Sequence, residues 1–128
     1  MSNTSGGDEV SDSEDIRIEK PWGFEIHWAK TDRYVGKVIH VNAGQALSLQ
    51  YHNVKDETIL VWQGRILFEI HADGQIHEEE LGPGSRKHIK PKTVHRMTAL
   101  EDSDIMEVST TELDDVVRLE DRYGRSSA

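Results

Sequence analysis

The strongest chemical signal in this sequence is a set of metal-ligating side chains on short, strand-like segments. In the run 46–52, alternation places Gln50 and His52 on one face, opposite a row of apolar residues. Glu57 opens the next apolar run, and His95 follows a later turn. If these strands are neighbours, two imidazoles and one carboxylate come together with Gln50 as a neutral fourth ligand, as in non-haem iron and several catalytic zinc sites. Spacing alone leaves a second interpretation open, a polar face in contact with bulk solvent.

The elements that would position these residues have mostly a period of two. Short runs rich in Val, Ile, Leu and aromatic residues predict strands over 24–28, 34–41, 46–51, 58–63 and 65–70. Glycine-containing turn signals separate them. Helical spacing occurs only over 112–119. The pattern predicts an all-β antiparallel sandwich or barrel with a short C-terminal helical segment.

Composition bounds the domain and its partners. The chain has 128 residues and a formal net charge of −9, and residues 1–15 hold five acidic and no basic side chains. We therefore expect a disordered acidic tail over 1–15, one domain over 16–125 and a frayed end over 126–128. The acidic balance argues against nucleic acid and anionic membrane surfaces as partners. With no cysteine, no long apolar run and no signal-peptide pattern, the sequence predicts a cytoplasmic protein without thiolate sites.

Two motifs resemble those of the cupin superfamily. From Gly44 to Gly64 the sequence reads G-x5-Q-x-H-x4-E-x6-G, which is similar to the first cupin motif, G-x5-H-x-H-x3,4-E-x6-G. The stretch from Gly84 to His95 resembles the second motif, a turn that leads to a histidine, although Lys90 and Lys92 stand where proline and glycine are usual. The resemblance implies a single-domain jelly-roll barrel, the double-stranded β-helix.

Further motifs resemble the cupin domain of type II mannose-6-phosphate isomerases. They are KPWGFE from Lys20, LSLQYH ending at His52, His95-Arg96, and DDVVRLEDRYGR ending at Arg125. This resemblance covers about residues 17–125 and implies one divalent metal ion held by four ligands, Gln50, His52, Glu57 and His95. We expect zinc, with manganese, iron or nickel as alternatives, and a homodimer. The chain departs from the family after His52, where it lacks two further histidines and an arginine.

A local excess of positive charge flanks His95. Residues 86–96 contain five basic side chains and no acid: Arg86, Lys87, Lys90, Lys92 and Arg96. A basic lip beside the metal would suit a small anionic sugar, sugar phosphate or carboxylate. The alternative is a solvated loop whose lysines protect a strand edge from pairing. Candidates for the proton relay or phosphate site are Lys37, Lys55, His88 and Arg96.

Three functions fit these observations. The first is a metal-dependent aldose–ketose isomerase acting on a sugar phosphate, similar to mannose-6-phosphate isomerase, in which the metal stabilises charge on an enediolate and a base moves the proton. The second is another metal cupin, a dioxygenase or decarboxylase, because two histidines and a carboxylate also serve iron and oxygen. The third is a non-catalytic module that binds a sugar or small acid.

Overall fold

Along the strands of this protein, buried residues alternate with more exposed ones. The computed structural model describes residues 16–125, so the predicted acidic tail 1–15 and frayed end 126–128 lie outside the described residues. On the strand Ser103–Ser109, Ile105 and Glu107 are buried, whereas Met106 between them is half-buried and Val108 is exposed. One face of each such strand therefore lines an interior, as the period of two predicts.

The described part of the chain contains eleven strands. The first six are β1 (Arg17–Lys20), β2 (Gly23–Lys30), β3 (Val35–Val41), β4 (Leu49–Tyr51), β5 (Glu57–Gln63) and β6 (Ile66–Ala72). The remaining five are β7 (Gln75–Leu81), β8 (Arg86–Ile89), β9 (Val94–Ala99), β10 (Ser103–Ser109) and β11 (Val117–Glu120). The strands predicted from alternation are confirmed, with β4 shorter than its apolar run.

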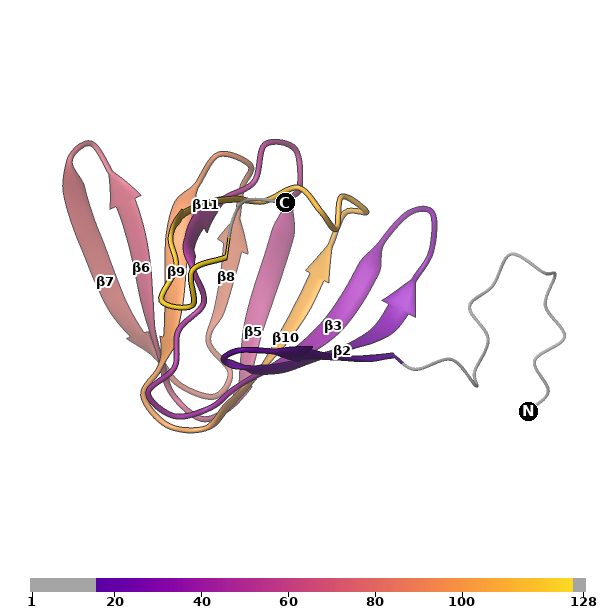
Figure 1. The fold of residues 1–128 in the computed structure, drawn as a ribbon, viewed down its shortest axis with the longest axis horizontal. Coiled ribbons are helices and arrows are strands. Elements are labelled where there is room, and N and C mark those ends of the chain that lie inside the picture. Colours follow the sequence, from indigo (N-terminus) through magenta and orange to yellow (C-terminus); the bar gives the residue numbers. More distant parts are fainter. Residues whose placement is uncertain (1–15, 126–128) are drawn as a thin grey trace, which may run out of the picture.

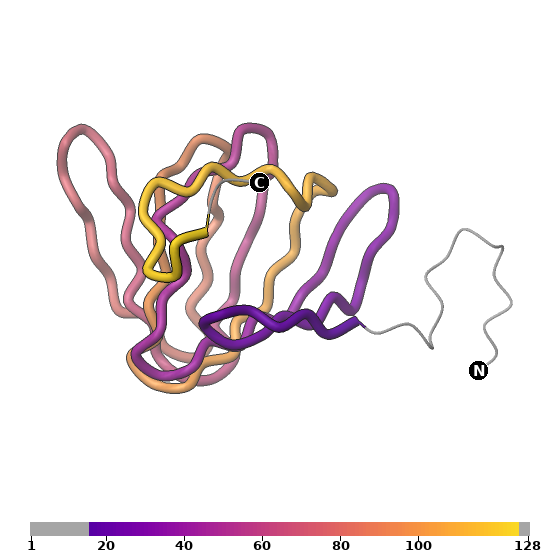
Figure 2. Tube along the Cα trace, viewed as in Figure 1, coloured from indigo at the N-terminus to yellow at the C-terminus, as the bar shows by residue number. Residues whose placement is uncertain are grey.

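The strands form two antiparallel sheets that enclose the core (Figures 1 and 2). One sheet has the order β1-β2-β3-β10-β5-β8 and the other β11-β4-β9-β6-β7. Neighbouring strands such as β3 and β10 are distant in sequence, as in a jelly roll. The all-β single-domain prediction is confirmed. Within residues 16–125 no helix has the length and apolar character needed to cross a membrane.

The interior of the barrel changes character from one end to the other. On β5 the buried residues run from Glu57 to Ile59 and Val61, and on β9 from His95 to Met97 and Ala99, so each strand has a polar and an apolar end. The apolar ends share one hydrophobic cluster. The antiparallel registers then place the polar residues together at the other end of the barrel.

The turn between β5 and β6 explains the last glycine of the first motif. Gly64 adopts a φ of 90°, and a Cβ added there would lie 2.3 Å from the Ser103 Oγ and 2.4 Å from the Asp102 carbonyl oxygen. Any side chain would therefore clash as well as strain the backbone. This turn closes the apolar end of the barrel.

The predicted C-terminal helix is wrong. Residues 112–116 form turns and Val117–Glu120 is the strand β11, which pairs with β4. The carboxylate of Asp115 accepts the backbone N–H groups of Asn53, Val54 and Lys55. The backbone of this segment is used at long range instead: Val117 and Arg118 pair with β4, and the Asp115 carbonyl accepts a hydrogen bond from His52. We call residues 110–125 the C-terminal strap (the yellow end of the chain in Figure 2).

Candidate metal centre

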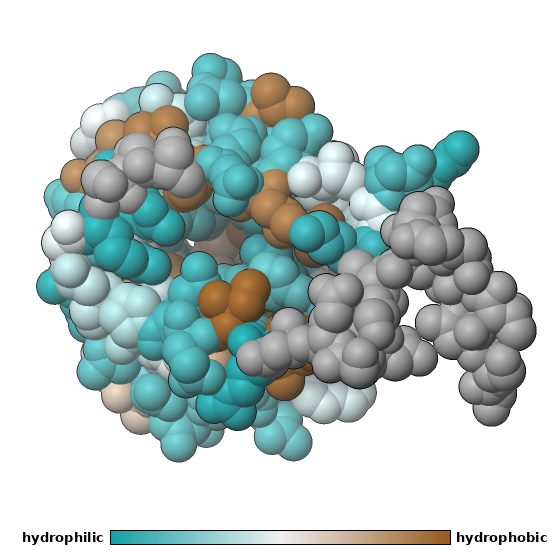
Figure 3. Space-filling model, turned by 45° about the vertical axis from the view of Figure 1, so that its right-hand side comes forward, coloured by the Kyte–Doolittle hydropathy of each residue, from teal (hydrophilic) through white to brown (hydrophobic). Residues whose placement is uncertain are grey.

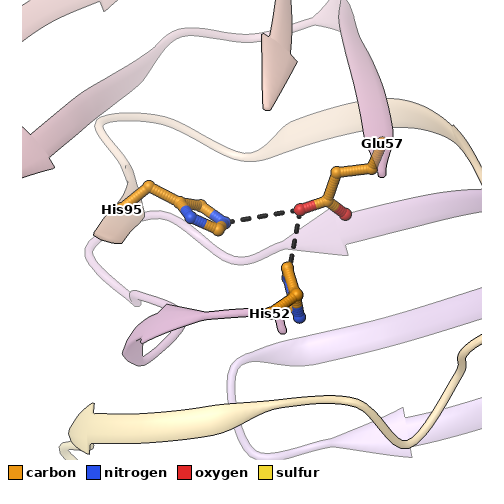
Figure 4. A group of neighbouring side chains, drawn as sticks. All are labelled: His52, Glu57 and His95. Atoms are coloured by element: carbon orange, nitrogen blue, oxygen red, sulfur yellow. Dashed lines mark ion pairs between the residues drawn. The ribbon is translucent and has the colours of Figure 1, made fainter. Parts of the chain in front are cut away.

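Three buried side chains converge at the polar end of the barrel. His52 follows β4, Glu57 begins β5 and His95 lies on β9. The Nε2 atoms of His52 and His95 lie 3.1 and 3.4 Å from the same carboxylate oxygen, Glu57 Oε2 (Figure 4). One ligand atom from each residue falls within 4.8 Å of the others. The structure therefore brings together two imidazoles and a carboxylate whose positions in the sequence are 5 to 43 residues apart.

Backbone carbonyls fix the orientation of both imidazole rings. The Nδ1 of His52 lies 2.5 Å from the Asp115 carbonyl oxygen, and the Nδ1 of His95 lies 2.8 Å from that of Thr93. Because a carbonyl oxygen only accepts, each Nδ1 carries a proton, so in the neutral imidazole, the form that binds a metal, each Nε2 presents its lone pair. Both Nε2 atoms are buried and make no hydrogen bond. Two unsatisfied lone pairs aimed at one carboxylate oxygen fit a divalent cation.

Gln50 stands beside this group. It is the register partner of His95 across β4 and β9, and it lines the same cavity. Its Oε1 accepts a hydrogen bond of 2.7 Å from the Ser48 hydroxyl. A carbonyl-type oxygen can still contribute a second lone pair to a metal. Its role as the fourth ligand stays a prediction.

Buried charges of alternating sign extend from the metal-ligand group into the barrel. The Lys55 Nζ lies 3.3 Å from Glu57 Oε1 and 3.3 Å from Glu107 Oε2. The Lys37 Nζ lies 3.8 Å from Glu107 Oε2 and 3.4 Å from Glu25 Oε1. Each carboxylate is thus beside at least one ammonium group, which compensates the loss of hydration on burial.

The same charges shift the pKa values of these groups. Burial acts to raise the pKa of Glu57, but contacts with His52 and His95 and the charge of Lys55 outweigh it, so the pKa lies well below its usual range. Burial, together with the Glu57 charge, raises the pKa of Glu107 to about 7 against the attraction of Lys55 and Lys37. Burial acts to lower the pKa of Lys55, but the Glu107 and Glu57 carboxylates raise it. Glu57 is therefore ionised at neutral pH, as a metal ligand must be.

The metal-ligand group and the buried charges line a cavity of about 560 Å³, a volume that includes the part open to solvent. The space-filling view shows a hollow bordered largely by hydrophilic residues (Figure 3). The cavity is lined by three carboxylates and five cationic side chains: Glu25, Glu57, Glu107, Lys20, Lys37, Lys55, Arg118 and Arg125. With neutral histidines its lining carries two excess positive charges, inside a chain whose net charge is −9.

The structure separates the remaining predicted site residues. Lys55 and Lys37 line the cavity, whereas His88 is exposed and contacts Asp56. Arg96 is adjacent to His95 on β9, so its side chain points to the opposite face of the sheet. There it forms an ion pair with Glu69. In residues 16–125 none of the five basic side chains of 86–96 lines the cavity. The positive charge that lines the cavity comes from other elements, and of the two interpretations of 86–96 this placement favours the solvated loop.

Sequence reasoning missed five of the charged residues that line this cavity. They come from the first two strands, from β10 and from the C-terminal strap: Lys20, Glu25, Glu107, Arg118 and Arg125. A signal existed for one of them. Glu107 has the same parity as Ile105, a buried apolar neighbour on β10, which places a charged side chain inside the barrel. No local pattern marks the cations of the strap.

The two-sheet barrel with an inward-facing His-Glu-His group defines a cupin. Residues 7–121 match the family described as Mannose-6-phosphate isomerase C-terminal, and the chain belongs to that family. The resemblance seen in the sequence motifs is thus confirmed.

Curated relatives are longer proteins that contain a similar domain. The chain is 34% identical over 116 residues to the mannose-1-phosphate guanylyltransferase ManC of Salmonella typhimurium, and equally to mannose-1-phosphate guanylyltransferase of Escherichia coli. Each alignment covers 84% of this chain and 23% of the relative. The chain therefore spans about a quarter of the length of these relatives.

Solved structures with the same fold are more distant in sequence. KdgF from Halomonas sp. superimposes with a TM-score of 0.66 at 20% identity, covering 80% of this chain and 92% of that one. Oxalate decarboxylase from Bacillus subtilis, which has Mn(II) centres, gives a TM-score of 0.69 at 16% identity over 80% of this chain and 29% of that one. These likenesses establish the cupin fold.

Proposed function

We propose that this protein is a metal-dependent aldose–ketose isomerase acting on a sugar phosphate, with mannose 6-phosphate as the first substrate to test. The observation that carries the proposal is the convergence of His52, Glu57 and His95 at the end of a cavity whose lining has excess positive charge. The family to which the chain belongs supports the choice of sugar.

The ligand group would hold one divalent ion, with Gln50 as the neutral fourth ligand. We propose zinc, and manganese, iron or nickel as alternatives, because imidazole and carboxylate donors accept all four. When bound, such an ion polarises a carbonyl oxygen and stabilises negative charge that develops on it. Lys55 keeps Glu57 ionised and in place through its contact of 3.3 Å.

In this proposal Glu107 is the base that transfers the proton. Its carboxylate is held between Lys55 and Lys37, both of which line the cavity. In aldose–ketose isomerisation a base removes the proton from the carbon next to the carbonyl and returns it to the former carbonyl carbon. Lys55 and Lys37 position Glu107 through their ion pairs with it, and their ammonium groups can donate hydrogen bonds to the sugar oxygens.

The test measures conversion of mannose 6-phosphate to fructose 6-phosphate by metal-reconstituted protein, together with deuterium uptake into the sugar in D₂O. We expect conversion with deuterium at the carbons that exchange the proton. Glu107→Gln should retain metal and lose at least a hundredfold in rate, in the range of general base catalysis. Val108→Ala, an exposed neighbour on β10, is the control.

Other outcomes identify the alternatives. Oxygen consumption by iron-loaded protein would indicate a dioxygenase, and carbon dioxide release would indicate a decarboxylase. Binding of sugar phosphate without any turnover or deuterium uptake would indicate a non-catalytic module. Each of these results would overturn the isomerase proposal. The predicted homodimer is measured in the same preparations by sedimentation equilibrium.

A further inference from the structure

The C-terminal strap brings an arginine into the row of residues that contains the candidate metal ligands. Arg118 on β11 is the register partner of Gln50 on β4, and Gln50 is the register partner of His95 on β9. Register partners on adjacent strands point to the same face of a sheet. Arg118, Gln50 and His95 therefore face the cavity together, and all three line it.

This row has the length of a small substrate. Two strand spacings separate Arg118 from His95, which is about 10 Å between their backbones. In an extended sugar phosphate of six carbons, six bonds of ~1.5 Å place the phosphorus roughly 7 Å from the second carbon. A ligand whose reacting carbons lie at the metal group can therefore present its phosphate to the Arg118 side chain.

Two further cations line the cavity. Arg125, near the end of the strap, is held by Asp121, whose carboxylate accepts hydrogen bonds of 3.1 and 2.8 Å from its guanidinium group. Lys20, at the end of β1, lines the cavity from the opposite sheet. Burial, together with the positive charge of Arg125, lowers the pKa of Arg118 against the attraction of the Asp121 carboxylate, so the two guanidinium groups are close enough to repel. A dianion placed between them would relieve this repulsion.

From these observations we infer that Arg118, Arg125 and Lys20 form an anion subsite that binds the phosphate monoester of the substrate and selects against uncharged sugars. The inference rests on the proposed function for the orientation of the sugar. It assigns the phosphate to the C-terminal strap, whereas the sugar carbons lie against the metal-ligand group. Arginine suits this role because its planar fork matches the oxygen atoms of a phosphate.

The experiment is calorimetric titration of the metal-loaded, full-length protein with mannose 6-phosphate, mannose and inorganic phosphate. We expect mannose 6-phosphate to bind far more tightly than mannose, and inorganic phosphate to compete with it. Arg118→Gln should weaken mannose 6-phosphate binding by about 10- to 100-fold, as expected for a lost charged hydrogen bond. Arg125→Gln should weaken it in the same direction. The matched control is Arg65→Gln, an exposed arginine at the apolar end of the barrel, which should change the affinity by less than about twofold.

Equal affinity of the wild type for mannose and mannose 6-phosphate would overturn the inference, as would wild-type affinity in both Arg118→Gln and Arg125→Gln. Circular dichroism and metal content verify that each variant is folded. If Arg118→Gln does not fold, the affinity of Arg125→Gln alone decides whether the anion subsite exists. Phosphate-dependent binding without turnover refutes the isomerase and leaves the subsite standing. Turnover that neither substitution affects refutes the subsite and leaves the isomerase standing.

Discussion

The rings of His52 and His95 are each oriented by a backbone carbonyl, but the two carbonyls differ in their distance along the sequence. The carbonyl that accepts from His95 belongs to Thr93, two residues earlier, whereas the one that accepts from His52 belongs to Asp115 in the C-terminal strap. One ligand is thus fixed locally and the other by a segment 63 residues away. The geometry of the candidate metal ligands therefore depends on the strap being in place.

His52→Ala should abolish metal binding. The substitution removes one of two imidazole ligands and leaves two buried donors that cannot hold a divalent ion tightly. After reconstitution we expect about one metal ion per wild-type chain and less than about a tenth of that in the variant, measured by elemental analysis. His77→Ala, which changes an exposed histidine on β7, should retain the wild-type metal content. Equal metal content in wild type and His52→Ala would refute the site.

At the residue scale the sequence predicts the ligands better than the groups around them. His52, Glu57 and His95 fall in motifs that resemble those of cupins, and the structure brings them together. Arg96 illustrates an error that strand geometry could have prevented, because a residue adjacent to inward-facing His95 must point outward. The cations of the strap could not be predicted, since their position depends on the pairing of β11 with β4.

Asp115 joins the strap to the loop that carries His52. Its carboxylate accepts three backbone N–H groups, from Asn53, Val54 and Lys55, and these bonds lower its pKa to about 2. The arrangement resembles a helix N-cap, in which a side-chain oxygen satisfies backbone donors that would otherwise lack a protein partner. Asp115 therefore anchors the strap through its carboxylate and orients His52 through its backbone carbonyl.

Asp115→Ala should lower both stability and metal affinity. Loss of a comparable capping side chain costs about 1–2 kcal/mol, and loosening a ligand's hydrogen-bonding partner weakens metal binding by roughly 10- to 100-fold. Thermal denaturation of metal-free protein and competition with a chelator measure the two effects. Asp114→Ala removes the same charge from an exposed neighbour and should leave both values near wild type. A normal metal affinity in Asp115→Ala would contradict this account of His52.

Strands β2 and β3 carry a pH-dependent contribution to stability through Glu25. Burial acts to raise the pKa of this carboxyl, but contacts with His27 and the charge of Lys37 lower it from 4.5 to about 2. Because the pKa is lower in the folded state, its stabilising contribution is present above about pH 4.5 and is lost as the pH falls toward 2. A shift of this size corresponds to about 3 kcal/mol.

Glu25→Gln should remove this pH dependence. Between about pH 6 and pH 2.5 we expect the unfolding free energy of the wild type to fall by roughly 3 kcal/mol more than that of the variant, in denaturant titrations of metal-free protein. The control is Glu78→Gln, at an exposed position on β7. Parallel pH profiles for wild type and Glu25→Gln would show that Glu25 makes no such contribution.

The strand elements were predictable and the strap was not, for one physical reason. In strands such as β5 and β10, burial of alternate residues in the core imposes a pattern that can be read locally. The segment 112–119 has apolar residues at helical spacing, yet its backbone pairs with β4 and accepts a hydrogen bond from His52, and its Asp115 carboxylate accepts N–H groups of the 53–55 loop. Where long-range contacts determine the conformation, local periodicity fails.

Over the whole molecule, the same strands build a stabilising end and a functional end. On β10, Ile105 lies in the hydrophobic cluster and Glu107, two residues later, lies in the cavity. The strand supports both because alternate residues share a face and successive positions on that face are about 7 Å apart. Loss of core packing should therefore be separable from loss of the metal group.

Ile105→Ala tests this separation. Ile105 is fully buried. Truncating its side chain should therefore lower the unfolding free energy by about 3 kcal/mol, because apolar contacts are lost and a cavity is left behind. At a temperature where circular dichroism shows the variant folded, it should still bind one metal ion, because the three ligand side chains are not in the cluster that Ile105 joins. Met106→Ala, at a half-buried position on the outer face of the same strand, should cost less and leave the metal content unchanged. Loss of metal from folded Ile105→Ala would mean that the two ends are coupled through β10, and that the apolar core sets the geometry of the ligands as well as the stability of the barrel.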